Sequence, residues 1–436
     1  MRLQHQAQDL INRSYYVDTA QAAAAHAPLR GDIRADVCIV GGGLAGLSAA
    51  LDLRQRGFDV VLLEGVRIGW GASGRNGGQA LVGYSSEMEP FEKQLGMGPA
   101  RLAWDISIEA IDLMRQRMAA HNIDCDWTPG AMTVAVTPRK RDALKEWAEH
   151  MQRDYGYSRM RWMNAEALGA EVASSRYVGG IFDDLSGHVH PLNYTLGLAR
   201  AANTAGVRIH ESSVVQEVRP AAHAGGGMAM VRTDGGTVRA KHVLLAGNVH
   251  LGTVSPRLAR RIMPVGTYII ATEPLGRDQA AALIPSRACI SDNQFVLDYY
   301  RLSADDRMLF GGRVSYSTLS PRDLSATMRR DMVRVFPQLS DAKVTHAWGG
   351  FVDITMNRAP DFGRIAPDVL YLQGFSGHGL ALTGMAGRLA AEAIAGHAER
   401  FDLFTRLRHN AFPGGDLLRT PALVLGMLWY RLRDLL

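Results

Sequence analysis

The feature that most constrains this chain is a glycine-rich turn between a buried strand and a helix. Residues 36–40 (DVCIV) are typical of a buried strand, and Leu44–Arg56 has apolar residues at helical spacing. The turn between them, residues 41–46, reads GGGLAG and fits G-x-G-x-x-G. A second buried strand, 59–63 (DVVLL), completes a strand–helix–strand unit of about 30 residues. We expect its crossover to be right-handed.

Each glycine of the motif has a separate physical purpose in such a unit. Gly41 permits the tight turn, Gly43 lets the backbone approach a pyrophosphate, and Gly46 lets the helix pack on the strand. Glu64, at the end of the second strand, is placed to accept hydrogen bonds from an adenosine ribose. A glycine-rich packing turn is the alternative, but it does not account for that acid. The pattern therefore predicts a dinucleotide-binding fold.

The segment Arg67–Gln79 (RIGWGASGRNGGQ) favours FAD over a nicotinamide cofactor. A nicotinamide dehydrogenase has no reason to follow its second strand with a loop so rich in glycine, serine, arginine and asparagine. A flavin enzyme does, because backbone must lie against the pyrophosphate and the isoalloxazine ring. The alternative interpretation is a flexible surface loop.

Length and alternation of elements indicate an α/β protein with a Rossmann-like FAD-binding domain and a second α+β substrate domain built on an antiparallel sheet. The chain has 436 residues. Beyond the first unit, the expected helices cover 101–121, 325–336 and 380–394. The expected strands cover 130–136, 213–218, 232–245, 263–272 and 294–312, with a hairpin turn at 234–236.

Charge and cysteine usage narrow the classes of partner. The formal net charge is +5, and no block of like charges marks a nucleic-acid arm, so we expect no nucleic-acid binding. Cys38, Cys125 and Cys289 lie far apart and show no metal spacing. Their small, odd number and the polar start, residues 1–14, indicate a reducing compartment and a cytoplasmic protein.

The C-terminal stretch 422–430 (ALVLGMLWY) is the feature most suggestive of a membrane surface. It is apolar, too short to span a bilayer, and is followed by Arg431 and Arg433. A peripheral membrane contact is one interpretation. A terminal helix packed on its own domain is the other, and the composition favours it.

At this point the sequence resembles the FAD-dependent D-amino-acid oxidase family, which includes glycine and sarcosine oxidases. The resemblance covers nearly the whole chain. Its motifs are GGGLAG, Glu64, GASGRNGG, the strand end Leu245–Asn248, and Gly374–Gly379 (GFSGHG). Within the family, the chain is most similar to bacterial gamma-glutamylputrescine oxidoreductases. The stretches shared with them include Ser14–Tyr16, GASGRNGGQ, Gly187–Asn193, Leu297–Leu302 and Phe412–Gly415.

The resemblance implies roles for individual residues around FAD. Gly41, Gly43, Gly46 and Glu64 would hold the adenosine diphosphate half. The loop residues that would line the pyrophosphate and flavin ring are Ser73, Arg75, Asn76, Gly77 and Gly78. Val215 would meet the adenine through its backbone. Gly377, His378 and Gly379, opening the helix 380–394, would stabilise negative charge at the N1–C2 carbonyl edge, with Thr383 one turn further on.

Five other residues are candidates for the substrate pocket or its frame. His188 and His190 lie two apart, but no third ligand stands nearby, so we expect no metal. His190 precedes Pro191, a natural first helical residue, so a structural role is the simplest, with the pocket wall as the alternative. Tyr299 and Tyr300 alternate on a strand, so one should be core and the other face the pocket. Trp348 is more naturally a packing residue than a substrate lid.

Two features of relatives are missing. The region 373–379 has no cysteine, so we expect FAD to be bound noncovalently. The stretch 261–274 has no lysine of the kind that sarcosine-type oxidases use to activate oxygen. Oxygen and a quinone or carrier therefore stay open as alternative electron acceptors.

The expected activity is oxidation of a small-molecule amine. The resemblance implies that the primary amine of gamma-glutamylputrescine is oxidised to an aldehyde with release of ammonia, by hydride transfer to flavin N5. Another amine or imino acid, such as a pipecolate-like ring, is the alternative, and a non-catalytic flavin redox sensor is a third. The FAD-binding domain is expected to comprise 1–100, 186–262 and 346–436, and the substrate domain 101–185 and 263–345.

Overall fold

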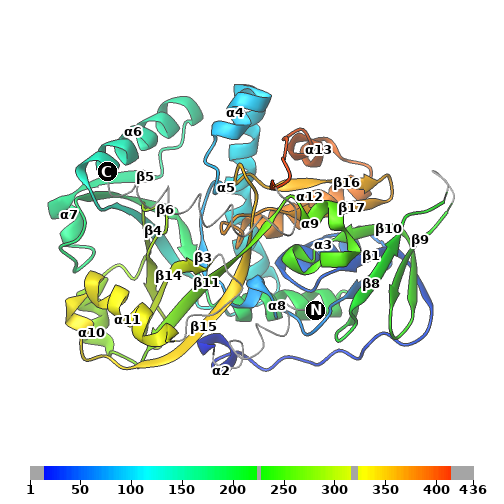
Figure 1. The fold of residues 1–436 in the computed structure, drawn as a ribbon, viewed down its shortest axis with the longest axis horizontal. Coiled ribbons are helices and arrows are strands. Elements are labelled where there is room, and N and C mark those ends of the chain that lie inside the picture. The colour runs from blue at the N-terminus through cyan, green and yellow to red at the C-terminus, as the bar shows by residue number, and fades with distance from the viewer. Residues whose placement is uncertain (1–13, 223–226, 316–322, 414–436) are drawn as a thin grey trace.

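The computed structural model describes residues 14–222, 227–315 and 323–413, which form two sheets with helices packed around them (Figure 1). The first sheet has the strand order β16 (Asp361–Ala366), β17 (Val369–Gln373), β10 (Thr237–Leu245), β1 (Ile33–Val40), β2 (Val60–Leu63), β7 (Arg208–His210), with β9 (Ala229–Thr233) and β8 (Val215–Arg219) joined through β10. The central strands β17, β10, β1, β2 and β7 are all parallel. This is a doubly wound dinucleotide-binding arrangement.

The second sheet is mostly antiparallel. Its order is β15 (Val344–Ile354), β11 (Met263–Thr272), β14 (Met308–Ser315), β13 (Tyr299–Leu302), β12 (Cys289–Asp292), β4 (Thr128–Ala135), β6 (Gly179–His188), β3 (Gln79–Ala80), with β5 (Met160–Asn164) on β6. Strand β3 comes from the loop that follows the first βαβ unit. The second sheet is therefore bonded directly to the predicted cofactor loop.

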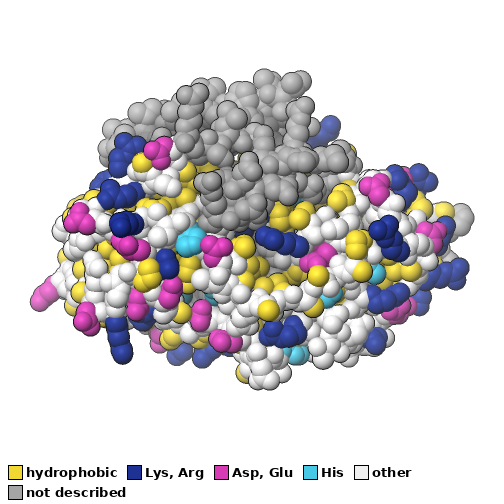
Figure 2. All heavy atoms as spheres, turned by 90° about the horizontal axis from the view of Figure 1, so that it is seen from below, with side chains coloured by type: hydrophobic (Ala, Val, Ile, Leu, Met, Phe, Trp, Pro, Cys, Tyr) yellow, Lys and Arg dark blue, Asp and Glu magenta, His cyan; other side chains and the backbone are white. Residues whose placement is uncertain are grey.

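Helices lie on both sheets and between them. They are α2 (Tyr15–Asp18), α3 (Leu44–Gln55), α4 (Glu89–Leu95), α5 (Met97–Ala120), α6 (Pro138–Tyr155), α7 (Ala165–Gly169), α8 (Pro191–Thr204), α9 (Pro256–Ala259), α10 (Arg277–Leu283), α11 (Leu324–Val335), α12 (Leu382–Ile394) and α13 (Glu399–Thr405). In Figure 1 the long helix α5 stands between the two sheets. On the face seen in Figure 2, basic and acidic side chains are interspersed.

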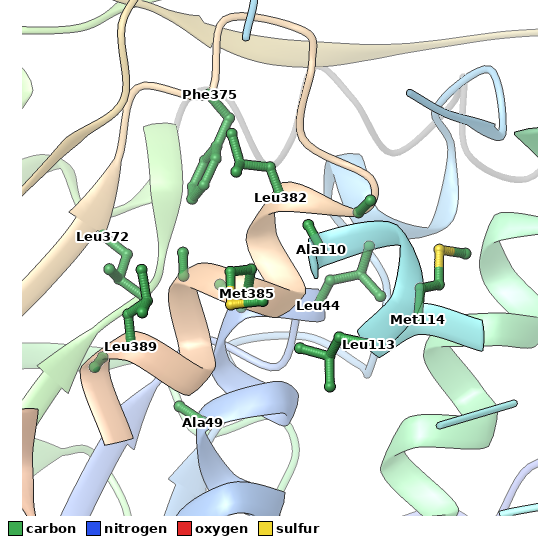
Figure 3. Close-up of a cluster of buried hydrophobic side chains, with 14 of the residues drawn as sticks. Leu44, Ala49, Ala110, Leu113, Met114, Leu372, Phe375, Leu382, Met385 and Leu389 are labelled. Atoms are coloured by element: carbon green, nitrogen blue, oxygen red, sulfur yellow. The ribbon is translucent and has the colours of Figure 1, made fainter. Parts of the chain in front are cut away.

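The main core joins α3, α5 and α12 on one face of the first sheet. Figure 3 shows Leu44 of α3, Leu113 and Met114 of α5, and Met385 of α12 converging there, all buried. Close approach is possible because Gly387 lies against the α3 backbone, where a Cβ would come 2.5 Å from the Ala45 carbonyl oxygen. These contacts fix the start of α3 and the start of α12 relative to each other.

The second sheet has a different partner on each face, because successive side chains of a strand alternate. Ile269 and Trp348 lie on the face toward α2 and α8. Ile270 and Phe310 face the other way and pack in the core that includes Met328 and Met332 of α11.

Most expected elements are confirmed. The strand, turn and helix of the first unit, the hairpin at 234–236, and the later strands lie where the pattern predicts them. The last long helix begins at Leu382, two residues later than expected, because Ser376 and Gly377 have φ of 53° and 87° and hold the chain in turns. Thr383 therefore lies at the second residue of α12, not one turn into it.

The expected division into two domains stays a prediction. Its boundaries can be compared with the extents of the two sheets and with the core around α5. Strand β15 pairs with β11 from Val344 to Ile354, so the second sheet extends past the expected boundary at 346. Helix α5, expected in the substrate domain, packs in the same core as α3 and α12. The apolar stretch 422–430 lies outside the described residues. No helix in the described ranges is long and apolar enough to span a membrane.

Candidate cofactor and active site

A long cavity runs along the carboxyl ends of β1 and β2, the edge where doubly wound sheets bind ligands. Of the residues assigned to FAD from the sequence, Gly41, Gly43, Glu64, Ser73, Val215 and Thr383 line it. Sequence segments more than 300 residues apart therefore meet on one cavity.

The glycine turn is shaped by close backbone contacts. Gly41 has φ of 119°, and a Cβ there would come 2.5 Å from the Ala246 carbonyl oxygen. A Cβ on Gly43 would come 2.7 Å from Ser73 Oγ. Gly46 does not line the cavity; a Cβ there would come 2.0 Å from the Gly41 carbonyl oxygen, so this glycine permits helix-to-strand packing.

Glu64 is held by backbone donors at the end of β2. Its Oε2 accepts from Gly42 N–H at 2.8 Å, and its Oε1 accepts from Val66 N–H at 2.8 Å. Burial raises the pKa of this carboxyl above its ordinary value, and Glu211 adds to the effect, while the two backbone donors oppose it. The carboxyl is thereby fixed on the cavity wall, where it can accept further hydrogen bonds.

The loop after β2 supplies a serine and a buried cation. Ser73 Oγ accepts from Leu44 N–H at the start of α3, at 3.0 Å. Arg75 donates from Nε to the Trp70 carbonyl at 2.6 Å and from Nη1 to the Gly349 carbonyl at 3.3 Å. Its Nη2 is buried with no hydrogen-bond partner among the described residues, and burial lowers the pKa of Arg75 to about 9. The buried guanidinium of Arg75 therefore keeps one N–H donor group, Nη2, that the described residues do not use.

Asn76, Gly77 and Gly78 shape the loop and do not line the cavity. Asn76 Oδ1 accepts from Gly78 N–H at 2.8 Å, while its amide donates to the Ala72 carbonyl at 2.9 Å. A Cβ on Gly77 would collide with the ring of Tyr299 at 2.7 Å. Close packing against the second sheet therefore requires this glycine.

The turn before α12 is anchored by a buried acid that the sequence analysis did not single out. The carboxylate of Asp353, at the end of β15, accepts from the N–H groups of Gly374 and Phe375. Burial raises the pKa of Asp353 to about 6. Phe375 lines the cavity, so Asp353 positions one wall of it.

Gly377, His378 and Gly379 lie in the chain between two cavity residues, Phe375 and Thr383, but are not among the residues that line the cavity. The His378 N–H donates to the Phe375 carbonyl at 3.0 Å, so this amide is already used within the turn. His378 Nε2 lies 3.2 Å from the Val82 carbonyl oxygen, and burial lowers the pKa of the imidazole. Thr383 Oγ1 donates to the Leu380 carbonyl at 3.4 Å.

His250 and Trp70 are cavity residues that sequence reasoning missed. Their rings meet edge to face at 5.2 Å, and the guanidinium carbon of Arg75 lies 4.6 Å from the centre of the Trp70 ring. Burial and the nearby charge of Arg75 lower the pKa of His250 to about 4, and its Nδ1 has no hydrogen-bond partner in the part of the chain that the structure describes. The sequence offered one indication for His250, because residues 248–250 follow the carboxyl end of a central parallel strand, where doubly wound sheets bind ligands.

The two tyrosines separate as the alternation of a strand requires. Tyr300 is 1% exposed, stacks on Phe310 at 5.7 Å and bonds Tyr177 through its hydroxyl at 2.9 Å. It belongs to the core on the far side of the second sheet. Tyr299 points the opposite way, against Gly77 of the cofactor loop.

His188, His190 and Trp348 are buried in the frame of the site. His190 caps α8, accepting from Asn193 N–H at 3.1 Å through Nδ1, while its Nε2 lies 3.1 Å from Thr19 Oγ1. His188 Nε2 donates to the Arg287 carbonyl at 2.9 Å. Trp348 Nε1 donates to the Arg75 carbonyl at 3.0 Å. No group of three or more His, Cys, Asp or Glu side chains within the described ranges could hold a metal ion.

The cavity residues fit FAD. A carboxylate at the end of β2 suits ribose hydroxyls, and the turn at Gly43 has room only for backbone, as close approach to a pyrophosphate requires. The ring nitrogen of His250, which has no partner among the described residues, suits a ring that carries carbonyl and ring-nitrogen groups, and the Arg75 guanidinium lies over the ring of Trp70, a second lining residue. Together the fold and the cavity define a dinucleotide-binding oxidoreductase of the flavoenzyme class.

Comparison with known proteins identifies the family. The family model described as "FAD dependent oxidoreductase" matches residues 36–393. The chain is 44% identical to the gamma-glutamylputrescine oxidoreductase of Escherichia coli (strain K12), over 97% of this chain and 98% of that one. It is 41% identical to a probable oxidoreductase of Haemophilus influenzae (strain ATCC 51907 / DSM 11121 / KW20 / Rd), over 97% of each.

Solved structures agree on the fold. Glycine oxidase from Bacillus cereus ATCC 14579 superposes with a TM-score of 0.70 at 20% identity, over 86% of this chain and 99% of that one. L-amino acid deaminase from Proteus myxofaciens gives 0.71 at 18% identity, over 88% and 94%. The chain belongs to the family of FAD-dependent oxidoreductases, and its cofactor is FAD.

Proposed function

We propose that this enzyme oxidises the terminal primary amine of gamma-glutamylputrescine. The carbon next to the nitrogen loses two electrons and a proton as hydride, and the nitrogen loses a proton, which gives an imine. Water then converts the imine to the aldehyde and ammonia. FAD, when bound, supplies the acceptor for the two electrons.

The observation that carries this proposal is the 44% identity to the E. coli enzyme of that name, spread over 97% of this chain. The cavity is consistent with it. The only ionisable side chains among the described lining residues are Glu64, on the β2 side, and His250. With a pKa of about 4, His250 is neutral at physiological pH, so it brings no positive charge of its own to the cavity.

The residues of the chain would bind FAD and orient it in the cavity. We infer that Glu64 and the turn at Gly41 and Gly43 hold the adenosine and pyrophosphate, with the Val215 backbone at the adenine. Ser73 and Arg75 would lie toward the flavin, and Asn76 with Gly77 and Gly78 would keep that loop in shape. The start of α12, with Gly377, His378, Gly379 and Thr383, would direct its positive dipole end at the N1–C2 carbonyl edge.

The composition of the cavity lining favours noncovalent binding of FAD. The described cavity-lining residues include no cysteine, and Cys38, Cys125 and Cys289 are buried elsewhere. Denaturing the holoenzyme should therefore release all of its flavin into the filtrate. The cavity lining in the described ranges also has no lysine, which leaves a quinone or carrier beside oxygen as the acceptor.

The decisive experiment is an anaerobic titration of the purified holoenzyme with gamma-glutamylputrescine, followed by flavin absorbance. Stoichiometric bleaching, with aldehyde and ammonia as products, is expected. Putrescine, pipecolate and glycine serve as comparison substrates. Faster bleaching by one of these would replace the proposed substrate, and bleaching by none of the four would leave only the flavoprotein fold.

A further inference from the structure

A second cavity lies away from the cofactor, where two arginine-rich segments about 150 residues apart face each other. One is 257–261 (RLARR), which begins at the second residue of α9; the other is 406–409 (RLRH), directly after α13. The cavity has a volume of about 400 Å³ and is also lined by residues of β16 and β17. This volume is within the range of small-molecule sites.

The lining is strongly basic. Five arginines contribute to it: Arg257, Arg261, Arg364, Arg406 and Arg408. The one acidic residue in the lining is Asp361, and it is already saturated. Its carboxylate accepts from Tyr371 Oη at 2.9 Å, from Gln373 Nε2 at 2.9 Å and from Arg261 Nη1 at 3.3 Å.

Within the described ranges, three of the five cavity arginines have no acidic partner. Arg364 pairs with Asp402 across 2.5 Å, and Arg261 pairs with Asp361. The side chains of Arg257, Arg406 and Arg408 have no ion-pair or hydrogen-bond partner among the described residues. These three exposed cations line one cavity, so their positive charges are concentrated around a single space.

His409 adds an independent observation. It lines the same cavity, and neither of its buried ring nitrogens makes a well-aligned hydrogen bond with the described residues, although the backbone of Pro360 lies near the ring. A buried polar atom without a partner is costly, so natural sites usually satisfy it with a ligand or water. The imidazole can donate a hydrogen bond from one ring nitrogen, and the unpaired guanidinium groups supply further donors beside it.

We propose that this cavity binds a phosphate group. Guanidinium groups match the oxygens of phosphate in pairs, and several unpaired cations favour a dianion over a singly charged carboxylate. Tyr371 lines this cavity, whereas its neighbour Leu372 lines the cofactor cavity, so the two sites lie on opposite faces of β17. The phosphate belongs to a small phosphate ester or to a lipid headgroup, which share this chemistry.

The test compares two double variants of the holoenzyme with equal loss of charge. Arg406→Gln with Arg408→Gln removes two unpaired cations of the cavity. Arg139→Gln with Arg239→Gln removes two exposed arginines elsewhere, and unfolding temperature and FAD content show that both variants are folded. Binding of inorganic phosphate and glycerol 3-phosphate is measured by calorimetry at constant ionic strength, with chloride as the blank.

Saturable phosphate binding that weakens at least tenfold in the cavity variant, and less than twofold in the control, is the expected result. A parallel arm uses vesicles of phosphatidylglycerol, with phosphatidylcholine as the neutral reference. Vesicle binding that depends on Arg406 and Arg408, without binding of the free esters, identifies a headgroup as the source. Equal binding by both variants, or no saturable binding in either arm, overturns the proposal.

Discussion

Arg301 donates from Nε to the Gly77 carbonyl at 2.7 Å and thereby ties the second sheet to the cofactor loop. The same guanidinium reaches the Val189 carbonyl at 2.9 Å and the Tyr16 hydroxyl at 3.1 Å. It is 4% exposed and has no carboxylate partner in these bonds. One side chain therefore holds together α2, the start of α8 and the glycine loop.

Replacing Arg301 with lysine should loosen that junction. An ammonium group keeps the charge but cannot span three separated acceptors, so buried carbonyls lose their donors. We expect a loss of about 2–4 kcal/mol in the free energy of unfolding and a lower FAD content after gel filtration. Arg232→Lys, on an exposed position of β9, is the control; equal FAD retention in both variants would contradict the assignment.

Glu64→Gln should weaken FAD binding by about tenfold, which corresponds to about 1.4 kcal/mol. The amide has one acceptor oxygen where the carboxylate has two, so its NH2 would confront the N–H of either Gly42 or Val66. Titrating apoprotein with FAD and following flavin fluorescence measures the effect. Glu217→Gln, on β8 and away from the cavity lining, should bind FAD like the unchanged protein.

The neighbours Tyr299 and Tyr300 should respond differently to the same change. Tyr300→Leu removes a ring from the far core and is expected to cost roughly 3 kcal/mol of stability, with kcat/KM unchanged within twofold. Tyr299→Leu removes the ring that lies against Gly77 and should alter the flavin absorption spectrum and kcat. The reverse pattern would place the pocket on the other face of the strand.

The rate should rise with pH until the substrate amine is neutral. An aliphatic ammonium has a pKa of about 10, whereas His250 has its pKa lowered to about 4, so His250 does not titrate in the assay range. We expect kcat/KM to increase about tenfold per pH unit from neutral pH toward that value. His250→Gln should lower the rate and leave the slope intact, and a flat profile would count against a neutral amine as the reacting form.

His190 should make the folded enzyme sensitive to acid. Burial and the charge of Arg301 lower the pKa of His190 to about 3, from an ordinary value of 6.5. Between these pH values the unfolded chain binds the additional proton, so the free energy of unfolding falls as pH falls from 6.5 toward 3. The contribution is at most about 1.4 kcal/mol per pH unit.

The variant His190→Asn isolates this effect, because asparagine also caps helices well. Denaturant unfolding at pH 7.5 and pH 5 should show a smaller acid loss in the variant than in the unchanged enzyme. His26→Asn, at a position away from this cap, should show the same acid loss as the unchanged enzyme.

Local sequence determined the cofactor half of this protein. The buried strand, the GGGLAG turn, the helix and Glu64 all lie within 30 consecutive residues. Their geometry follows from backbone sterics and from the alternation of buried strand and helix. The hairpin at 234–236 and the capping place of His190 before Pro191 are equally local. Such features depend on neighbours a few residues away, so they can be read without the tertiary structure.

The remaining features depend on contacts between segments that lie far apart in the sequence. Alternation required Tyr299 and Tyr300 to face opposite ways, but only the packing of Phe310 and Gly77 showed which is core. No pattern of neighbouring residues predicts three other contacts. They are Asp353 with the Gly374 N–H, Arg301 with the Gly77 carbonyl, and the arginines of 257–261 facing those of 406–409. Burial and hydrogen bonding across the fold create these relationships, because they are set by which distant elements pack together.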